Sequence, residues 1–134
     1  NHYVRGLSSW SLLLALSGAS WSAPDATLRL VPPGAGRRFS CVYTAGTAWG
    51  VAELGRSARR ALATFRVEDG SVRLRRLRLP AAFARLERGW IEPGTTFVKG
   101  TAERRGGETQ VEFPEPVELK GGQALVLAFL STKG

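Results

Sequence analysis

The chain has 134 residues, enough for one domain that buries a core of its own. A hydrophobic share of 43% excludes a disordered protein, and the single cysteine excludes an internal disulfide and a CxxC metal site. The formal net charge of +8, carried mostly by arginine, favours phosphate attraction that weakens with salt.

Residues 1–18 predict a helix, because Tyr3, Leu7, Trp10 and Leu14 recur at helical spacing. Apolar residues on its other sides predict that it is buried all round, which requires further helices around it. A signal peptide is the competing interpretation of this segment, whereas its apolar run is too short for a membrane-spanning helix. The sequence has no methionine, even at position 1, so we expect the chain to come from a longer or processed protein.

The pattern becomes alternating after Pro24, which predicts six to nine short strands in an antiparallel sheet or sandwich. Glycine-containing turns at 68–71, 104–107 and 120–122 predict three hairpins. Residues 81–86 fit either a helix or a strand, and Pro114 and Pro116 argue against a long central strand there. The predicted strands are 27–31, 39–44, 48–53, 60–68, 72–79, 95–103, 108–113, 117–119 and 123–130.

The pair Arg75-Arg76 interrupts the alternation of the strand at 72–79, because the apolar residues have opposite parity before and after it. This phase slip predicts a β-bulge that brings four arginines to one face. Such a stripe suits phosphate binding by a nucleic-acid partner, or is a solvated face. The lack of interleaved aromatic residues favours the solvated face. The four are Arg73, Arg75, Arg76 and Arg78.

The run His2-Tyr3-Val4-Arg5, followed by Ser8-Ser9-Trp10 and the segment 12–18, resembles a stretch near the C-terminus of glycoside hydrolase family 116. That family includes bacterial β-glucosidases and non-lysosomal glucosylceramidases. The resemblance covers about residues 1–54. Its later part lies at 28–32 and in a block formed by Phe39, Tyr43-Thr44 and Trp49-Gly50.

The resemblance and the strand pattern together predict an α+β fold class. By the resemblance, residues 1–20 would be the buried last helix of an (α/α)6 barrel. By the alternating pattern, residues 21–134 would be a mostly antiparallel β-rich tail of six to nine short strands. The resemblance also implies a retaining glycosidase with a glutamate nucleophile and an aspartic acid as proton donor, acting on a β-glucoside or a glucosylceramide-like carbohydrate. Neither carboxylate has a match here, so we expect this chain to contain no catalytic residue and to be inactive without the missing N-terminal part. No cofactor or metal is implied.

One functional residue carries over by resemblance: Arg5 aligns with an arginine that contacts sugar hydroxyls, and a salt bridge at the helix end is its alternative role. His2 fits a position in the core or at the pocket edge better than a catalytic one. Trp49 and Trp90 either stack on sugar rings or pack in the core, and Cys41 is expected to be a buried structural thiol. The alternative function is a non-enzymatic β-sandwich that binds carbohydrate or, through the arginine stripe, nucleic acid.

Overall fold

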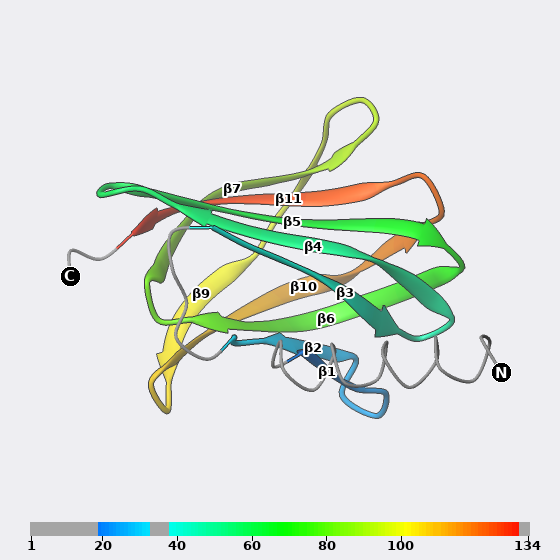
Figure 1. Ribbon diagram of the computed structural model, residues 1–134, viewed down its shortest axis with the longest axis horizontal. Helices are drawn as coiled ribbons and strands as arrows, with labels where there is room; N and C mark the ends of the chain where they lie inside the picture. The colour runs from blue at the N-terminus through cyan, green and yellow to red at the C-terminus, as the bar shows by residue number, and fades with distance from the viewer. Residues whose placement is uncertain (1–18, 33–37, 132–134) are drawn as a thin grey trace, which may run out of the picture.

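The computed structural model describes residues 19–32 and 38–131, and every regular element among them is a β-strand. The strands are β1 (Ala19–Ser22), β2 (Thr27–Leu30), β3 (Arg38–Ala45), β4 (Ala48–Arg56), β5 (Arg60–Asp69), β6 (Ser71–Pro80), β7 (Phe83–Glu92), β8 (Thr96–Val98), β9 (Thr101–Arg105), β10 (Glu108–Lys120) and β11 (Ala124–Ser131). Sheet A has the order β1-β2-β6-β10-β9, and sheet B has the order β3-β4-β5-β11-β7-β8. The two sheets face each other as a sandwich (Figure 1).

The predicted α+β fold class, with the last helix of an (α/α)6 barrel, is wrong: residues 19–32 and 38–131 are all-β and contain no helix. The helix expected over 1–18 lies outside the described residues. Ala19 and Ser20, expected at its end, pair instead with Leu30 and Arg29 across the β1–β2 hairpin. The physical reason is that the apolar faces of the two sheets cover each other, so the β region completes a core with no helical layer.

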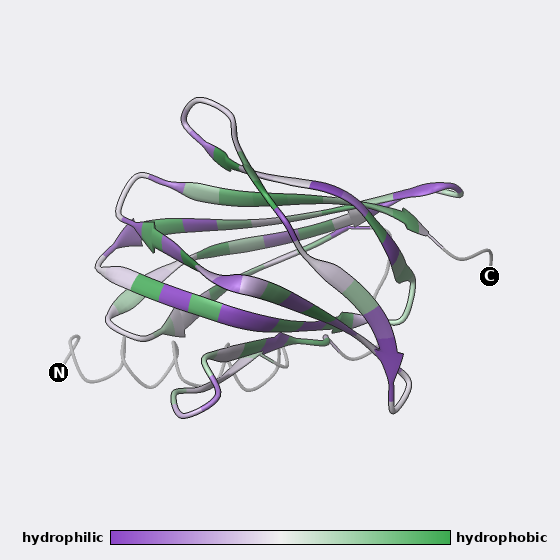
Figure 2. Ribbon diagram, turned by 180° about the vertical axis from the view of Figure 1, so that it is seen from behind, coloured by the Kyte–Doolittle hydropathy of each residue, from purple (hydrophilic) through white to green (hydrophobic). Residues whose placement is uncertain are grey.

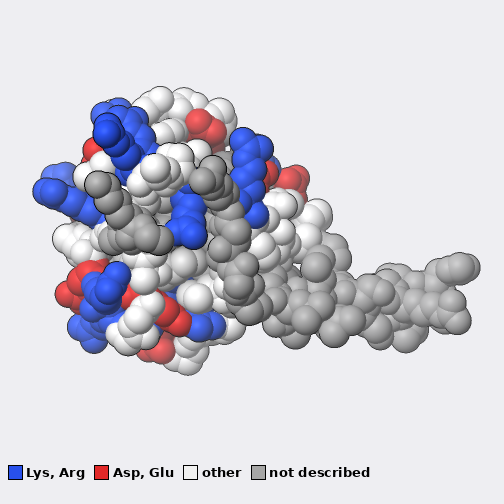
Figure 3. Space-filling view, turned by 60° about the vertical axis from the view of Figure 1, so that its left-hand side comes forward, with Lys and Arg blue, Asp and Glu red and all other residues white. Residues whose placement is uncertain are grey.

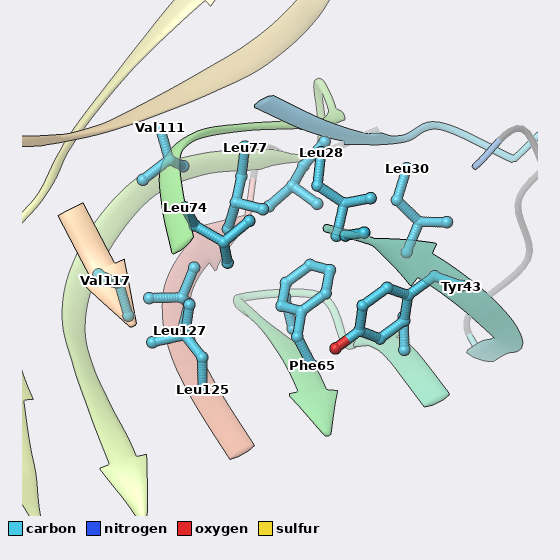
Figure 4. Close-up of a cluster of buried hydrophobic side chains, with 14 of the residues drawn as sticks. Leu28, Leu30, Tyr43, Phe65, Leu74, Leu77, Val111, Val117, Leu125 and Leu127 are labelled. Carbon is cyan, nitrogen blue, oxygen red and sulfur yellow. The ribbon is translucent and has the colours of Figure 1, made fainter. Parts of the chain in front are cut away.

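The core lies between the sheets and is built from the inward-facing residues of both. Leucines of β2 and β6 from sheet A meet Phe65 of β5 and Leu125 and Leu127 of β11 from sheet B (Figure 4). The strands carry alternating polar and apolar bands, as a two-layer sandwich requires (Figure 2). Tyr43 and Phe65 meet edge to face, with ring centroids 6.2 Å apart. Burial of one face per sheet therefore accounts for the alternation in the sequence.

One predicted hairpin is confirmed and two are wrong. The 104–107 turn joins β9 to β10, which pair antiparallel. The 68–71 and 120–122 turns instead carry the chain from one sheet to the other, from β5 to β6 and from β10 to β11. Gly70 lies at the first of these two turns. Its φ is +84°, and a Cβ there would overlap the carbonyl group of Thr47 in the β3–β4 turn. The Asp-Gly turn is thus packed against a neighbouring turn and forms a corner of the sandwich.

The predicted bulge at Arg75-Arg76 is confirmed. The amides of both residues donate to the carbonyl oxygen of Ala26, at 2.9 and 3.3 Å, so two residues of β6 oppose one. Leu74 and Leu77 on either side are both buried, which shows the change of parity. Strand β6 therefore keeps its apolar side chains in the core along its whole length.

Three other predictions made from the sequence are revised by the structure. Strand β10 runs for 13 residues through Pro114 and Pro116, and its pairing with β6 lapses between Glu112 and Val117, so the prolines cost no ladder hydrogen bonds. The ambiguous 81–86 segment is largely strand, because β7 begins at Phe83. The single strand predicted over 95–103 is two strands, β8 and β9, which belong to different sheets.

Candidate functional site

The block that resembles the glycosidase family, at residues 39–50, forms one hairpin, β3–β4, in which Tyr43 and Gly50 are cross-strand partners. The Tyr43 hydroxyl donates to the carbonyl oxygen of Arg66 on β5, at 3.1 Å. A Cβ on Gly50 would overlap that same carbonyl group. Burial raises the pKa of the Tyr43 phenol, and the negative charge of Glu68 raises it further. The tyrosine and the glycine of the block thus have a packing role in the hairpin.

The outer face of sheet B carries all the large hydrophobic side chains that are exposed among the described residues. They are Trp49, Leu62, Phe97 and Leu130, and Phe97 is the most open, with 70% of its surface accessible. Each lies on the side of its strand opposite the core. The outer face of sheet A has none of them, so the two faces of the sandwich differ in chemistry. The large apolar side chains that the described residues expose therefore lie on one face of the sandwich.

Two adjoining hollows, of about 540 and 680 Å³, lie on this face of sheet B and share Arg38, Gly55 and Leu62. We name them together the sheet B groove. Gly55 leaves the space open, because nothing lies within 4 Å of where its Cβ would be. The larger hollow is lined by Arg38, Gly55, Arg56, Ser57, Arg60, Ala61, Leu62, Glu87, Arg88, Trp90, Ala128 and Phe129, and the smaller adds Phe39, Ser40, Glu53, Leu54 and Thr64. Their volumes fall within the range of ligand pockets, and both hollows are wide open to solvent.

Trp90 supplies the aromatic surface of the groove. It pairs across the strands with Val126 of β11 on one side and with Phe97 of β8 on the other. Its indole N–H donates to a carboxylate oxygen of Glu92 at 3.2 Å. Val126 is buried, although it lies on the outer side of its strand. The indole is therefore held by neighbours on the sheet while part of it remains open to solvent.

The outer face of sheet A is occupied by ion pairs. Glu108 binds Arg29 through both carboxylate oxygens and lies 3.2 Å from Arg78, and Arg76 donates to Glu112 at 2.8 Å. The hydrogen bond from Arg29 is the main reason that the pKa of Glu108 lies below its usual value. Basic and acidic side chains also lie side by side in the lower part of the molecule in Figure 3.

The structure places only some of the residues singled out from the sequence. Arg5 and His2 lie outside the described residues. Trp49 and Trp90 both lie on the outer face of sheet B, but only Trp90 lines the groove. The prediction of a buried thiol at Cys41 is confirmed. Of the four-arginine stripe, Arg76 and Arg78 are engaged by carboxylates, Glu112 and Glu108.

Sequence reasoning missed the arginines of the groove, which come from β3, the β4–β5 turn and β7. These segments are far apart in the chain and become neighbours only through the strand order of sheet B. One signal was available: residues 124–130 are all apolar, so β11 is apolar on both faces. Ala124 and Val126 on the outer side of this strand are buried, so the apolar run marks the middle of sheet B.

Within residues 19–32 and 38–131, no group of three His, Cys, Asp or Glu side chains is arranged to hold a metal ion. The same residues include no helix long and apolar enough to cross a membrane. Comparisons of the chain with protein-family models, with curated proteins and with solved structures find no match.

Proposed function

We propose that the sandwich is the non-catalytic, carbohydrate-binding part of a glycoside hydrolase that acts on β-glucosides or glucosylceramide-like substrates. The resemblance of residues 1–54 to family 116 supports the glycosidase part of this proposal. The observation that carries the binding role is the sheet B groove, where Trp90 and Leu62 lie beside several guanidinium groups.

The chemistry of the groove suits a sugar chain. A pyranose ring has an apolar C–H face, which packs on an aromatic ring such as Trp90, and an edge of hydroxyl groups. Arg38 and Arg88 each present a planar fan of N–H donors that suits hydroxyl oxygens. Because the hollows adjoin and open along the sheet, the groove fits a stretch of linear oligosaccharide better than an enclosed small molecule.

The arginine stripe of β6 supports a nucleic-acid partner less well. Arg76 and Arg78 already interact with Glu112 and Glu108, so part of the positive charge that would attract phosphates is neutralised. Among the described residues, the outer face of sheet A exposes no large hydrophobic side chain on which bases could stack, and Trp21, which lines a hollow beside Arg76 and Arg78, packs against the core. We therefore keep the solvated-face interpretation of the stripe.

The test is a titration of the full chain with cellotetraose, a linear tetrasaccharide of β-linked glucose, followed by calorimetry and tryptophan fluorescence. We expect binding, and we expect Trp90→Ala to weaken it about tenfold, as loss of an aromatic contact would. Trp49→Ala is the matched control, because Trp49 is exposed on the same sheet face but outside the groove. Trp90→Phe keeps a flat apolar ring and should retain part of the affinity.

Circular dichroism and urea unfolding of each variant establish that it is folded before affinities are compared. Equal affinity of wild type, Trp90→Ala and Trp49→Ala would refute the assignment of the groove as the sugar site. Failure of both cellotetraose and other neutral or acidic oligosaccharides to bind would refute the carbohydrate-binding function as a whole.

A further inference from the structure

The sheet B groove has an excess of positive charge. Four arginines line its larger hollow, Arg38, Arg56, Arg60 and Arg88, against the carboxylate of Glu87 there and that of Glu53 in the smaller hollow. The ion pairs found within residues 19–32 and 38–131 involve none of these four guanidinium groups. In sheet A, by contrast, Arg29, Arg76, Arg78 and Arg105 each have a carboxylate partner, and only Arg73, Arg75 and Arg104 take part in none of these ion pairs.

The register of sheet B arranges the charges in a particular way. Arg38 pairs with Gly55, Gly55 with Leu62, Leu62 with Ala128, and Ala128 with Arg88. One cross-strand row therefore runs over β3, β4, β5, β11 and β7, with an arginine at each end and small or apolar residues between. Four interstrand steps separate its ends, which is about 19 Å between the two backbones.

This row gives a ligand an apolar floor and a charged group at both ends. Gly55 and Ala128 have no side chain or a small one, so the surface is lowest there. The side chain of Leu62, 45% exposed, projects from the row and lines both hollows. Arg56 and Arg60, at the β4–β5 turn, add positive charge along one side of the larger hollow. A neutral oligosaccharide would use these guanidinium groups only through their N–H donors. An oligosaccharide with carboxylate groups would use their charge as well.

We propose that the groove is specific for an acidic oligosaccharide whose carboxylate groups bind the arginines at the two ends of the row. This inference rests on the carbohydrate-binding function proposed above and adds the class of sugar. Guanidinium and carboxylate groups match in geometry, since two parallel N–H donors meet two oxygens. Because these arginines form no ion pair with a carboxylate of residues 19–32 or 38–131, the bound acid would displace none of the ion pairs found there.

The experiment compares two probes that differ only in charge: cellotetraose and the same tetrasaccharide oxidised at every C6 to a glucuronic acid unit. We expect the acidic probe to bind at least about tenfold more tightly at low salt, and we expect this advantage to shrink as salt rises. Arg38→Gln and Arg88→Gln should each weaken the acidic probe about fivefold and cellotetraose by less, because only the acidic probe loses an exposed ion pair as well as a hydrogen-bond donor. Arg73→Gln and Arg75→Gln, on β6 in sheet A, are the matched controls and should change neither probe.

The outcomes separate the two proposals. If cellotetraose binds as tightly as its acidic form, the acidic specificity is overturned and the carbohydrate-binding function stands. If neither probe binds, both proposals fail. If a single-stranded oligonucleotide binds more tightly than the acidic probe and loses its affinity in Arg38→Gln and Arg88→Gln, the groove recognises nucleic acid and the inference is overturned.

Discussion

Gly50 offers a sharp test of how the β3–β4 hairpin is built. In Gly50→Ala the new Cβ would lie closer than 3.0 Å to both the carbonyl oxygen and the carbonyl carbon of Arg66, a distance that real Cβ atoms essentially never show. Both atoms belong to the backbone of β5, so no side-chain rotation relieves the overlap. Strands β4 and β5 would have to separate, and the hydrogen bond from Tyr43 to Arg66 would be strained or lost.

The cost follows from two contributions. Overpacking a buried position destabilises a fold by about 1–3 kcal/mol, and loss of one hydrogen bond adds about 1 kcal/mol. We therefore expect Gly50→Ala to lower the free energy of unfolding by about 2–4 kcal/mol. Gly55→Ala is a control on the same strand, because its Cβ would point into open space. It should be neutral or stabilising by about 0.5 kcal/mol, through the reduced entropy of the unfolded chain.

Urea unfolding followed by circular dichroism measures both variants, and an unchanged slope shows that the change is one of stability. If Gly50→Ala is no less stable than Gly55→Ala, the close approach of β4 to Arg66 is refuted. The packing explanation of the Tyr43 and Gly50 positions then fails with it.

Further predictions concern Tyr43 and Glu108. Tyr43→Phe should lower the free energy of unfolding by about 1 kcal/mol, because the carbonyl oxygen of Arg66 loses its donor. Since burial raises the pKa of Tyr43 in the folded state, its contribution to stability is complete below the unfolded pKa of about 10 and is lost at higher pH. The phenolate absorbance of Tyr43, taken as the difference between wild type and Tyr43→Phe, should appear only with unfolding. Glu108→Gln should destabilise the fold by about 1–2 kcal/mol near neutral pH, because Arg29 and Arg78 lose their shared carboxylate. The pKa of Glu108 is lowered in the folded state, so this difference from wild type should shrink as pH falls through and below about 4; a constant difference from pH 7 to pH 3 would contradict the ion pairs.

The sequence predicted local strand structure well, because alternation reflects burial of one face. The slip at Arg75-Arg76 was readable for the same reason: leucines on either side of the pair have opposite parity and must all reach one core. The sequence predicted the pairing of the strands less well. An Asp-Gly turn at 69–70 shows that the chain reverses, but the choice of sheet for β6 depends on contacts with Thr47, which is more than twenty residues away.

The candidate site was beyond single-sequence reasoning for a related reason. Arg38, Leu62 and Arg88 belong to one row only because β11 lies between β5 and β7. No sequence pattern around any of these three residues indicates that they lie in one row. Trp90 was identified as a possible sugar-stacking residue by its type alone, and only the register places it beside the arginines of the groove. The helix at 1–18 and Arg5 stay predictions.

The position of β11 has a consequence for how the chain folds during synthesis. It is the last described strand along the chain, yet it forms the centre of sheet B, where it joins β5 to β7. Until β11 leaves the ribosome, the β3–β4–β5 and β7–β8 units each present an unpaired inner edge to solvent, and such edges invite association with other chains. A nascent chain halted before residue 124 should therefore need a chaperone to stay monomeric, whereas release of a few more residues closes both edges at once.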